Sequence, residues 1–312
     1  MEVPIPIKAI GVFDTVGSLG IPQVPFLTWL RLRSTRSGQF YDTNLSPRVQ
    51  HAFQALALDE NRMPYSPSIW ERLSSNGGAT DLRQVWFPGT HSNVGGGKAD
   101  QGLADVSIAW MMDQLASVGV AFDDGCLDRL YNQTAQAYNN PKRSKLARKW
   151  AADAIYTVNR PQRPWGLGEM VKDVSLVVSL LMGWKMRTPG LYQKKDPDTK
   201  KWVPLSDTDE RVHSSVRVRT ACRGLGINDC GVWKNNAMKR NWTLKQVESG
   251  EAAGAVWYWE YKGTEEEAPP TKVIPEEPLG PYQRYFLQLS GGNPNVYEWA
   301  GEAGEVQEVS RG

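Results

Sequence analysis

The sequence predicts an α/β fold built around a parallel sheet. Residues 5–13 and 82–87 form short, largely apolar runs of the kind that becomes a buried strand. Each run ends in a glycine-containing turn with one ionisable residue, Asp14 in the segment GVFDTVG and His91 in the segment FPGTHSNVGGG. Segments with helical spacing follow both turns. Alternation of strand, loop and helix is typical of a parallel sheet covered by helices.

Two helices are expected in the same part of the chain. The first is predicted over residues 47–59, with Ser46 as its N-cap, a proline at the first helical position and apolar residues at helical spacing. The second is predicted to begin near Asp105, which can cap it, and to end at Gly119. Residues 74–81 are rich in Ser, Gly and Asn and are expected to form a loop.

The character of the chain changes near residue 139. We therefore predict a first unit over residues 1–138 and an accessory region over 139–312, mostly helical and rich in tryptophan. In that region, residues 142–149 are basic, and residues 264–281 are acidic, proline-rich and expected to form an exposed loop. The apolar stretch 174–184 is too short to span a bilayer as a helix. We favour packing of this stretch in a core or between domains over a role as a lipid-facing lid.

Overall composition points to a cytoplasmic protein. The 312 residues carry a net charge of only +2, which gives no reason to expect nucleic-acid binding. A mean hydropathy of −0.48 argues against an integral membrane protein. The first residues lack the features of a signal peptide. The basic run 142–149 leaves peripheral contact with a membrane surface open, and the oligomeric state cannot be deduced.

No cofactor or metal site is expected. The glycines before Lys98 resemble a phosphate loop but fail its spacing. His213 could join Cys222 and Cys230 around a metal only with unconvincing spacing. These two cysteines and Cys126 make an odd number, which suits a reducing compartment better than a disulfide framework. His51, inside the first predicted helix, is expected to be structural.

Asp14 and His91 are the candidate catalytic residues. Reactive groups of open α/β sheets lie at the carboxyl ends of the strands, where both residues are placed. An imidazole can take the proton of a serine hydroxyl, and a carboxylate can hold that imidazole in the correct tautomer. Each residue also has an ordinary interpretation, the Asp as a turn cap and the His as a structural residue. If the pair is catalytic, its two side chains should lie within hydrogen-bond reach.

Several ordered motifs resemble a single family. They are GVFDTVGS (11–18), LSPRVQHA (45–52), ALDENR (57–62), VWFPGTHSNVGGG (85–97), LADVSIAWM (103–111), RTPGLY (187–192) and ERVHSSVRVR (210–219). Together they resemble the uncharacterised α/β-hydrolase family related to the phospholipase effectors of bacterial type VI secretion, in its fungal form. The resemblance implies the C-terminal part of an α/β-hydrolase-like sheet and a serine hydrolase of lipid metabolism that acts on lipid esters. It places the acid on Asp14 and the base on His91.

The nucleophile that this resemblance implies is missing from the 312 residues. In the family, the serine lies upstream of the acid in a GFSRG turn, a form of G-x-S-x-G. That pattern occurs nowhere in the sequence, and none of the thirteen residues before Asp14 is a serine. Ser18 and Ser92 do not substitute for it by position. We therefore expect a chain truncated before the nucleophile turn and inactive on its own. The alternative is a non-catalytic interaction or scaffold protein derived from the hydrolase fold.

Overall fold

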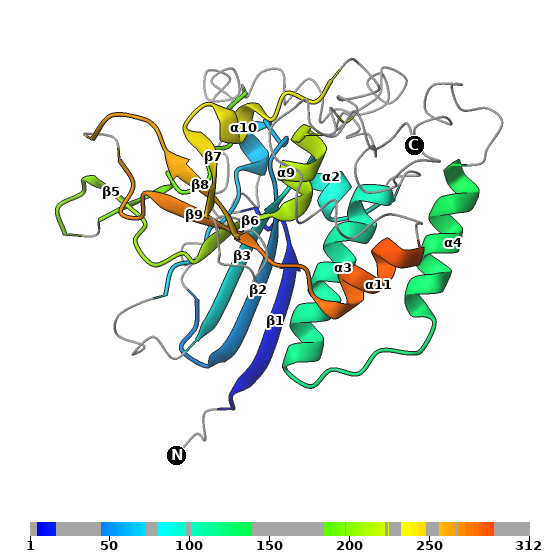
Figure 1. The fold of residues 1–312 in the computed structure, drawn as a ribbon. Helices are drawn as coiled ribbons and strands as arrows, with labels where there is room; N and C mark the ends of the chain where they lie inside the picture. Colours follow the sequence, from blue (N-terminus) through cyan, green and yellow to red (C-terminus); the bar gives the residue numbers. More distant parts are fainter. Residues whose placement is uncertain are drawn as a thin grey trace, which may run out of the picture.

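The centre of the protein is a mostly parallel sheet of seven strands (Figure 1). The computed structural model describes residues 5–16, 45–72, 80–97, 101–138, 184–196, 198–221, 224, 232–247, 256–265 and 268–289. In sheet order the strands are β1 (Ile7–Phe13), β2 (Val49–Ala57), β3 (Asp81–Phe87), β6 (Glu210–His213), β9 (Val273–Glu277), β8 (Val256–Tyr261) and β7 (Trp242–Val247). The first five are parallel, and β8 and β7 are added antiparallel. The α/β prediction is confirmed.

Strand β2 corrects the prediction of a helix over residues 47–59. Residues 47 and 48 form a turn, and residues 49–57 then run parallel to both β1 and β3. Almost every side chain of β2 is buried, because the strand lies in the interior of the sheet with both faces covered. A strand covered on both faces need not alternate strictly between apolar and polar residues, so the apolar residues of β2 matched helical spacing by chance. The predicted strands at 5–13 and 82–87 are present as β1 and β3.

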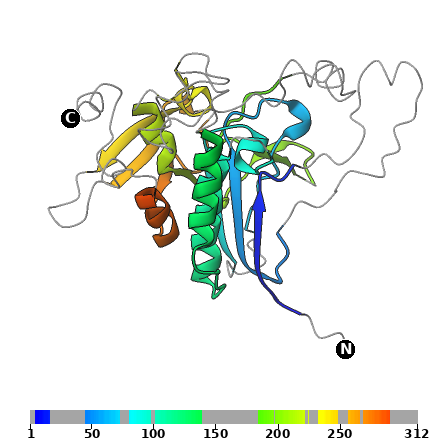
Figure 2. The same cartoon turned by 90° about the vertical axis from the view of Figure 1, so that its right-hand side faces the viewer.

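Among the described elements, three helices cover one face of the sheet. Helix α3 (Gly102–Ser117) crosses this face, and α11 (Pro281–Leu289) packs against α3 and α4 (Cys126–Tyr138) (Figures 1 and 2). The core here joins strand residues such as Phe53 to Trp110 and Phe286. The predicted second helix is therefore present. Asp105 lies in its first turn and accepts a hydrogen bond from the Thr134 hydroxyl, rather than acting as the N-cap.

The opposite face holds a second core that is rich in tryptophan. It is formed by residues of β2, β3 and β6 together with α9 (Ser214–Ala221), α10 (Asn236–Lys239) and the β7–β8 pair. Trp86, Trp242 and Trp259 are buried in it. Four short elements complete the described structure: helix η1 (Met63–Tyr65), helix α2 (His91–Val94) and the separate antiparallel pair of strands β4 (Gln193–Lys195) and β5 (Trp202–Pro204).

The described part of residues 139–312 contains strands as well as helices, and the mostly helical character of the whole region stays a prediction. The described part supplies strands β4 to β9 as well as α9, α10 and α11. Because β6 pairs with β3, the sheet continues across the boundary predicted at residue 138. The division of the chain into two domains stays a prediction. Residues 142–149 and almost all of 174–184 lie outside the described residues.

The segment 264–281 also departs from the expected exposed loop, because strand β9 lies within it between β6 and β8. Glu277 is buried there, and its carboxylate accepts hydrogen bonds from Trp110 Nε1 at 3.1 Å and Arg211 Nη1 at 3.0 Å. Such partners allow an acidic residue into the interior. Within the described ranges, no helix has both the length and the apolar character needed to cross a membrane.

Candidate active site

Asp14 lies at the carboxyl end of β1, where the sheet holds its carboxylate in place. Its backbone N–H donates to the Ala55 carbonyl at 2.6 Å, and the Ala57 N–H donates to its Oδ1 at 2.9 Å. The side chain is completely buried. Its backbone has φ of 48°, a left-handed conformation that Asp tolerates better than most residues. Residues in such sparsely populated backbone conformations are found especially at functional sites.

His91 lies beyond the end of β3 as the first residue of α2. Thr90 and Asn93 form a capping box at the start of this helix, with the Thr90 N–H donating to Asn93 Oδ1 at 3.0 Å. The turn before it needs Gly89, whose φ is 112° and where a Cβ would lie 2.7 Å from the Asn93 Cβ. Asp59 holds the turn by accepting the Gly89 N–H at 2.7 Å, while its own N–H donates to the Gly89 carbonyl at 2.8 Å.

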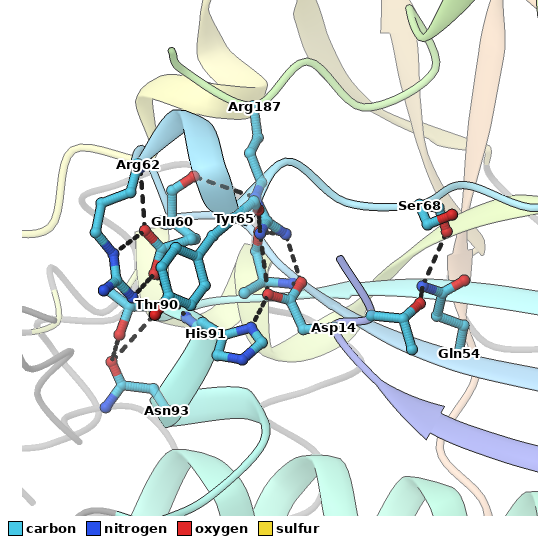
Figure 3. Close-up of polar contacts among 12 residues, drawn as sticks. Asp14, Gln54, Glu60, Arg62, Tyr65, Ser68, Thr90, His91, Asn93 and Arg187 are labelled. Atoms are coloured by element: carbon cyan, nitrogen blue, oxygen red, sulfur yellow. Dashed lines mark hydrogen bonds and ion pairs between the residues drawn. The ribbon is translucent and has the colours of Figure 1, made fainter. Parts of the chain in front are cut away.

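The two candidate residues are in contact, as expected. His91 Nδ1 lies 2.7 Å from Asp14 Oδ2 (Figure 3). An ionised carboxylate only accepts hydrogen bonds, so this contact places the proton of a neutral imidazole on Nδ1 and leaves the lone pair on Nε2. Nε2 has no hydrogen-bond partner within the described residues, and the His91 side chain is 31% exposed. The arrangement can accept a proton from an approaching hydroxyl.

Arg187 is a member of the site that the catalytic assignment from sequence missed. It is buried and forms a bidentate ion pair with Asp14, with Nη1 donating to Oδ1 and Nη2 to Oδ2, the second bond at 2.9 Å (Figure 3). The only sequence signal was its place in the motif RTPGLY. No local pattern indicates that this segment reaches the end of β1, 173 residues away.

The electrostatics of Asp14 follow from this pair. Burial alone raises the pKa of the carboxyl group, but the charge of Arg187 and the hydrogen bonds from His91 and Arg187 more than offset it. The pKa of Asp14 therefore lies below the ordinary 3.8. Burial disfavours the charged form of Arg187 as well, yet the Asp14 carboxylate raises its pKa above the usual value. Both groups are ionised at neutral pH.

Residues after β2 support the other side of the imidazole. Glu60 Oε2 accepts the backbone N–H of His91 at 3.3 Å, and Glu60 is itself held by a bidentate pair with Arg62 at 2.8 and 2.9 Å. The Tyr65 ring meets the His91 ring edge to face at a centroid distance of 5.1 Å. The Arg62 guanidinium covers Tyr65 at 3.6 Å. These contacts restrict the orientation of the base.

The other histidines lie elsewhere. His51 is on strand β2 rather than in a helix, and its Nδ1 lies 3.2 Å from Asp81 Oδ2 at the opposite end of the sheet. His213 is fully buried, stacks on Phe87 and contacts the Ser215 hydroxyl at 2.7 Å. Burial lowers the pKa of His213 to about 3, so it is neutral and inaccessible. Among the described residues, no cluster of His, Cys, Asp or Glu could hold a metal ion.

Residues 1–114 match the family described as "T6SS, Phospholipase effector Tle1-like, catalytic domain". This confirms the resemblance predicted from the motifs. The matched segment contains β1, β2, β3, α2 and most of α3, and with them Asp14 and His91. Arg187 lies beyond it.

One relative also matches the chain. It is an uncharacterized protein of Saccharomyces cerevisiae, 30% identical over 110 residues, which covers 31% of this chain and 14% of the yeast protein. The chain thus spans a small part of the relative's length. No solved structure matches the chain.

Proposed function

We propose that this chain supplies the acid and the base of a serine ester hydrolase that acts on phospholipid esters. Asp14 is the acid and His91 the base. One observation carries the proposal: a buried, ionised carboxylate holds His91 Nδ1, while Nε2 has no partner among the described residues and the His91 side chain is partly exposed. The family match, whose description names a phospholipase, supports the substrate class.

In the proposed reaction, His91 Nε2 takes the proton of a serine hydroxyl as its oxygen attacks the ester carbonyl. The imidazolium that forms keeps its Nδ1–H bond to Asp14, whose negative charge stabilises it. Nε2 then gives the proton to the leaving alcohol, which departs and leaves an acyl-enzyme. A water molecule, deprotonated by the same nitrogen, then attacks the carbonyl of the acyl-enzyme. The fatty acid is released, and Nε2 returns the proton to the serine oxygen.

We further propose that the serine comes from polypeptide outside these 312 residues. The sequence contains no G-x-S-x-G turn. In the described part of the chain, β1 has β2 as its one neighbour in the sheet order. A parallel strand placed beside β1 on the side away from β2 would end beside Asp14 and His91, where a nucleophile is needed. The 312-residue chain on its own should hydrolyse no ester.

The test is a hydrolysis assay on the polypeptide that the cell makes, as defined by sequencing its transcript. With a G-x-S-x-G segment present, fatty-acid release from phospholipid vesicles should fall about 10⁴-fold on Asp14→Asn and comparably on His91→Ala. His51→Ala is the matched control, since it removes a similar His–Asp contact at the far end of the sheet. Undiminished activity in His91→Ala would reject the assigned base.

The non-catalytic alternative makes a different prediction in the same experiment. If the transcript encodes no such segment and the native protein releases no fatty acid, the folded acid–base pair is a remnant on an interaction scaffold. The same absence of a G-x-S-x-G turn favours this second function.

A further inference from the structure

All five N–H groups of Arg187 are used within the site. A guanidinium carries five donors in a fixed plane. Besides its two bonds to Asp14, Arg187 donates from Nε to the Glu60 carbonyl at 3.1 Å, from Nη1 to the Ala57 carbonyl at 2.9 Å and from Nη2 to the Tyr65 carbonyl at 2.7 Å. The side chain is 2% exposed. Because all five donors are engaged in hydrogen bonds, the buried guanidinium restricts the movement of the groups that it contacts.

These bonds decide which way the Asp14 carboxylate faces. Oδ1 accepts from the Ala57 N–H and from Arg187 Nη1, and Oδ2 accepts from His91 Nδ1 and from Arg187 Nη2. Rotation of the carboxylate would break several of these bonds at once. The guanidinium plane thereby holds Oδ2 toward the imidazole.

The carbonyl contacts extend this control to the base. Ala57 ends β2, and Glu60 and Tyr65 follow in the segment that supports His91 through a carboxylate and an aromatic ring. A single side chain thus ties the end of β1, the end of β2 and the support of the imidazole together (Figure 3).

We propose that Arg187 is a positioning residue for the acid–base pair, so that the site is completed by a side chain from outside the segment that matches the family. Its relevance to catalysis rests on the proposed function, whereas its effect on Asp14 and His91 stands on the geometry alone. Lysine cannot replace it, because an ammonium is a point charge without the planar fork of a guanidinium.

The experiment is an NMR measurement on the 312-residue chain, independent of activity. Aspartate is labelled with ¹³C, and the Asp14 Cγ signal is assigned as the one lost in Asp14→Asn. At pH 4 this signal should report a carboxylate in the wild type and a protonated acid in Arg187→Met, because the charge that lowers the pKa of Asp14 below 3.8 is gone. The downfield His91 Nδ1–H signal should be present in the wild type and broadened or absent in Arg187→Met.

Two further variants separate positioning from general stability. Arg217→Met removes another buried arginine, which pairs with Glu276 at 2.7 and 2.8 Å, and should leave both signals unchanged. Arg187→Lys keeps the charge and so should keep the Asp14 carboxylate at pH 4, but it should broaden the His91 Nδ1–H signal. This variant provides the test if Arg187→Met does not fold.

Wild-type signals in Arg187→Met would overturn the proposal, and so would an unchanged Nδ1–H signal in Arg187→Lys. Neither result depends on ester hydrolysis. If the signals change as expected but no phospholipid is ever hydrolysed, the proposed function fails while the role of Arg187 in holding the pair stands. If hydrolysis is found and the signals do not change, Arg187 is structural only.

Discussion

The buried ion pair between Asp14 and Arg187 should dominate the stability of the site. The two side chains are 0% and 2% exposed, so replacing one partner leaves the other charge buried without its counter-ion. Breaking such a pair costs about 3–5 kcal/mol. We expect a loss of that size in Arg187→Met and a similar or somewhat smaller loss in Asp14→Asn, since asparagine still accepts from the Ala57 N–H. Either loss is a large fraction of the roughly 5–15 kcal/mol typical of a folded protein.

The double variant decides whether the pair is the cause. Asp14→Asn combined with Arg187→Met leaves no uncompensated charge, so its loss should be smaller than the sum of the single losses by at least about 2 kcal/mol. Urea unfolding followed by both tryptophan fluorescence and circular dichroism measures each free energy and checks that the probes agree. The exposed pair Lys272–Glu265 is the control, with side chains 54% and 84% exposed and an expected coupling of no more than about 1 kcal/mol. Additive losses at the buried pair would show that the two charges do not stabilise each other.

Three other predictions concern the support of the site. Gly89→Ala should lower the free energy of unfolding by about 1–3 kcal/mol more than Gly97→Ala in thermal melts. Both glycines have positive φ, but only at Gly89 would a Cβ meet Asn93 Cβ at 2.7 Å, and equal losses would contradict the clash. The pKa of Asp14 is lower in the folded state than the roughly 3.9 of the unfolded chain. Its stabilising contribution is therefore present above about pH 4 and lost as the pH falls through the folded value. As the pH falls below 4, the free energy of unfolding should therefore decrease less in Asp14→Asn than in the wild type. Parallel curves of this free energy against pH would contradict the lowered pKa of Asp14. The pKa of Asp113 is raised to about 6, first by burial, so folding favours its protonated form and that stability is lost as the pH rises through about 6. Between pH 4 and pH 7, the melting temperature of Asp113→Asn should rise relative to that of the wild type. A difference between the two melting temperatures that does not change with pH would contradict the raised pKa of Asp113.

Much of the site could be predicted because its signals are local. The apolar runs before Asp14 and His91 become β1 and β3, which pack in one parallel sheet and end at the same edge. Pro88 and Gly89 mark the turn that ends β3. These features place Asp14 and His91 at one edge of the sheet, whereas the expectation that their side chains meet rested also on the catalytic interpretation and the family resemblance.

The remainder depends on tertiary contacts that no local pattern encodes. Residues 49–57 satisfy the rules for a helix, yet they form a strand because β1 and β3 pair with both of their edges. Strand β9 lies in an acidic, proline-rich segment whose buried Glu277 is accommodated by Trp110 and Arg211. Arg187 reaches Asp14 across 173 residues, and its motif gave no indication of that partner.

We propose that this chain holds an ordered acid and base without a nucleophile of its own. A fluorophosphonate probe tests it most directly, because such probes bond covalently to a serine that a neighbouring base has activated. The purified 312-residue chain is incubated with the probe, and intact-protein mass spectrometry measures the adduct. We expect no labelling above that of the His91→Ala variant. Stoichiometric labelling of a serine, abolished by His91→Ala, would show that the chain has a nucleophile of its own.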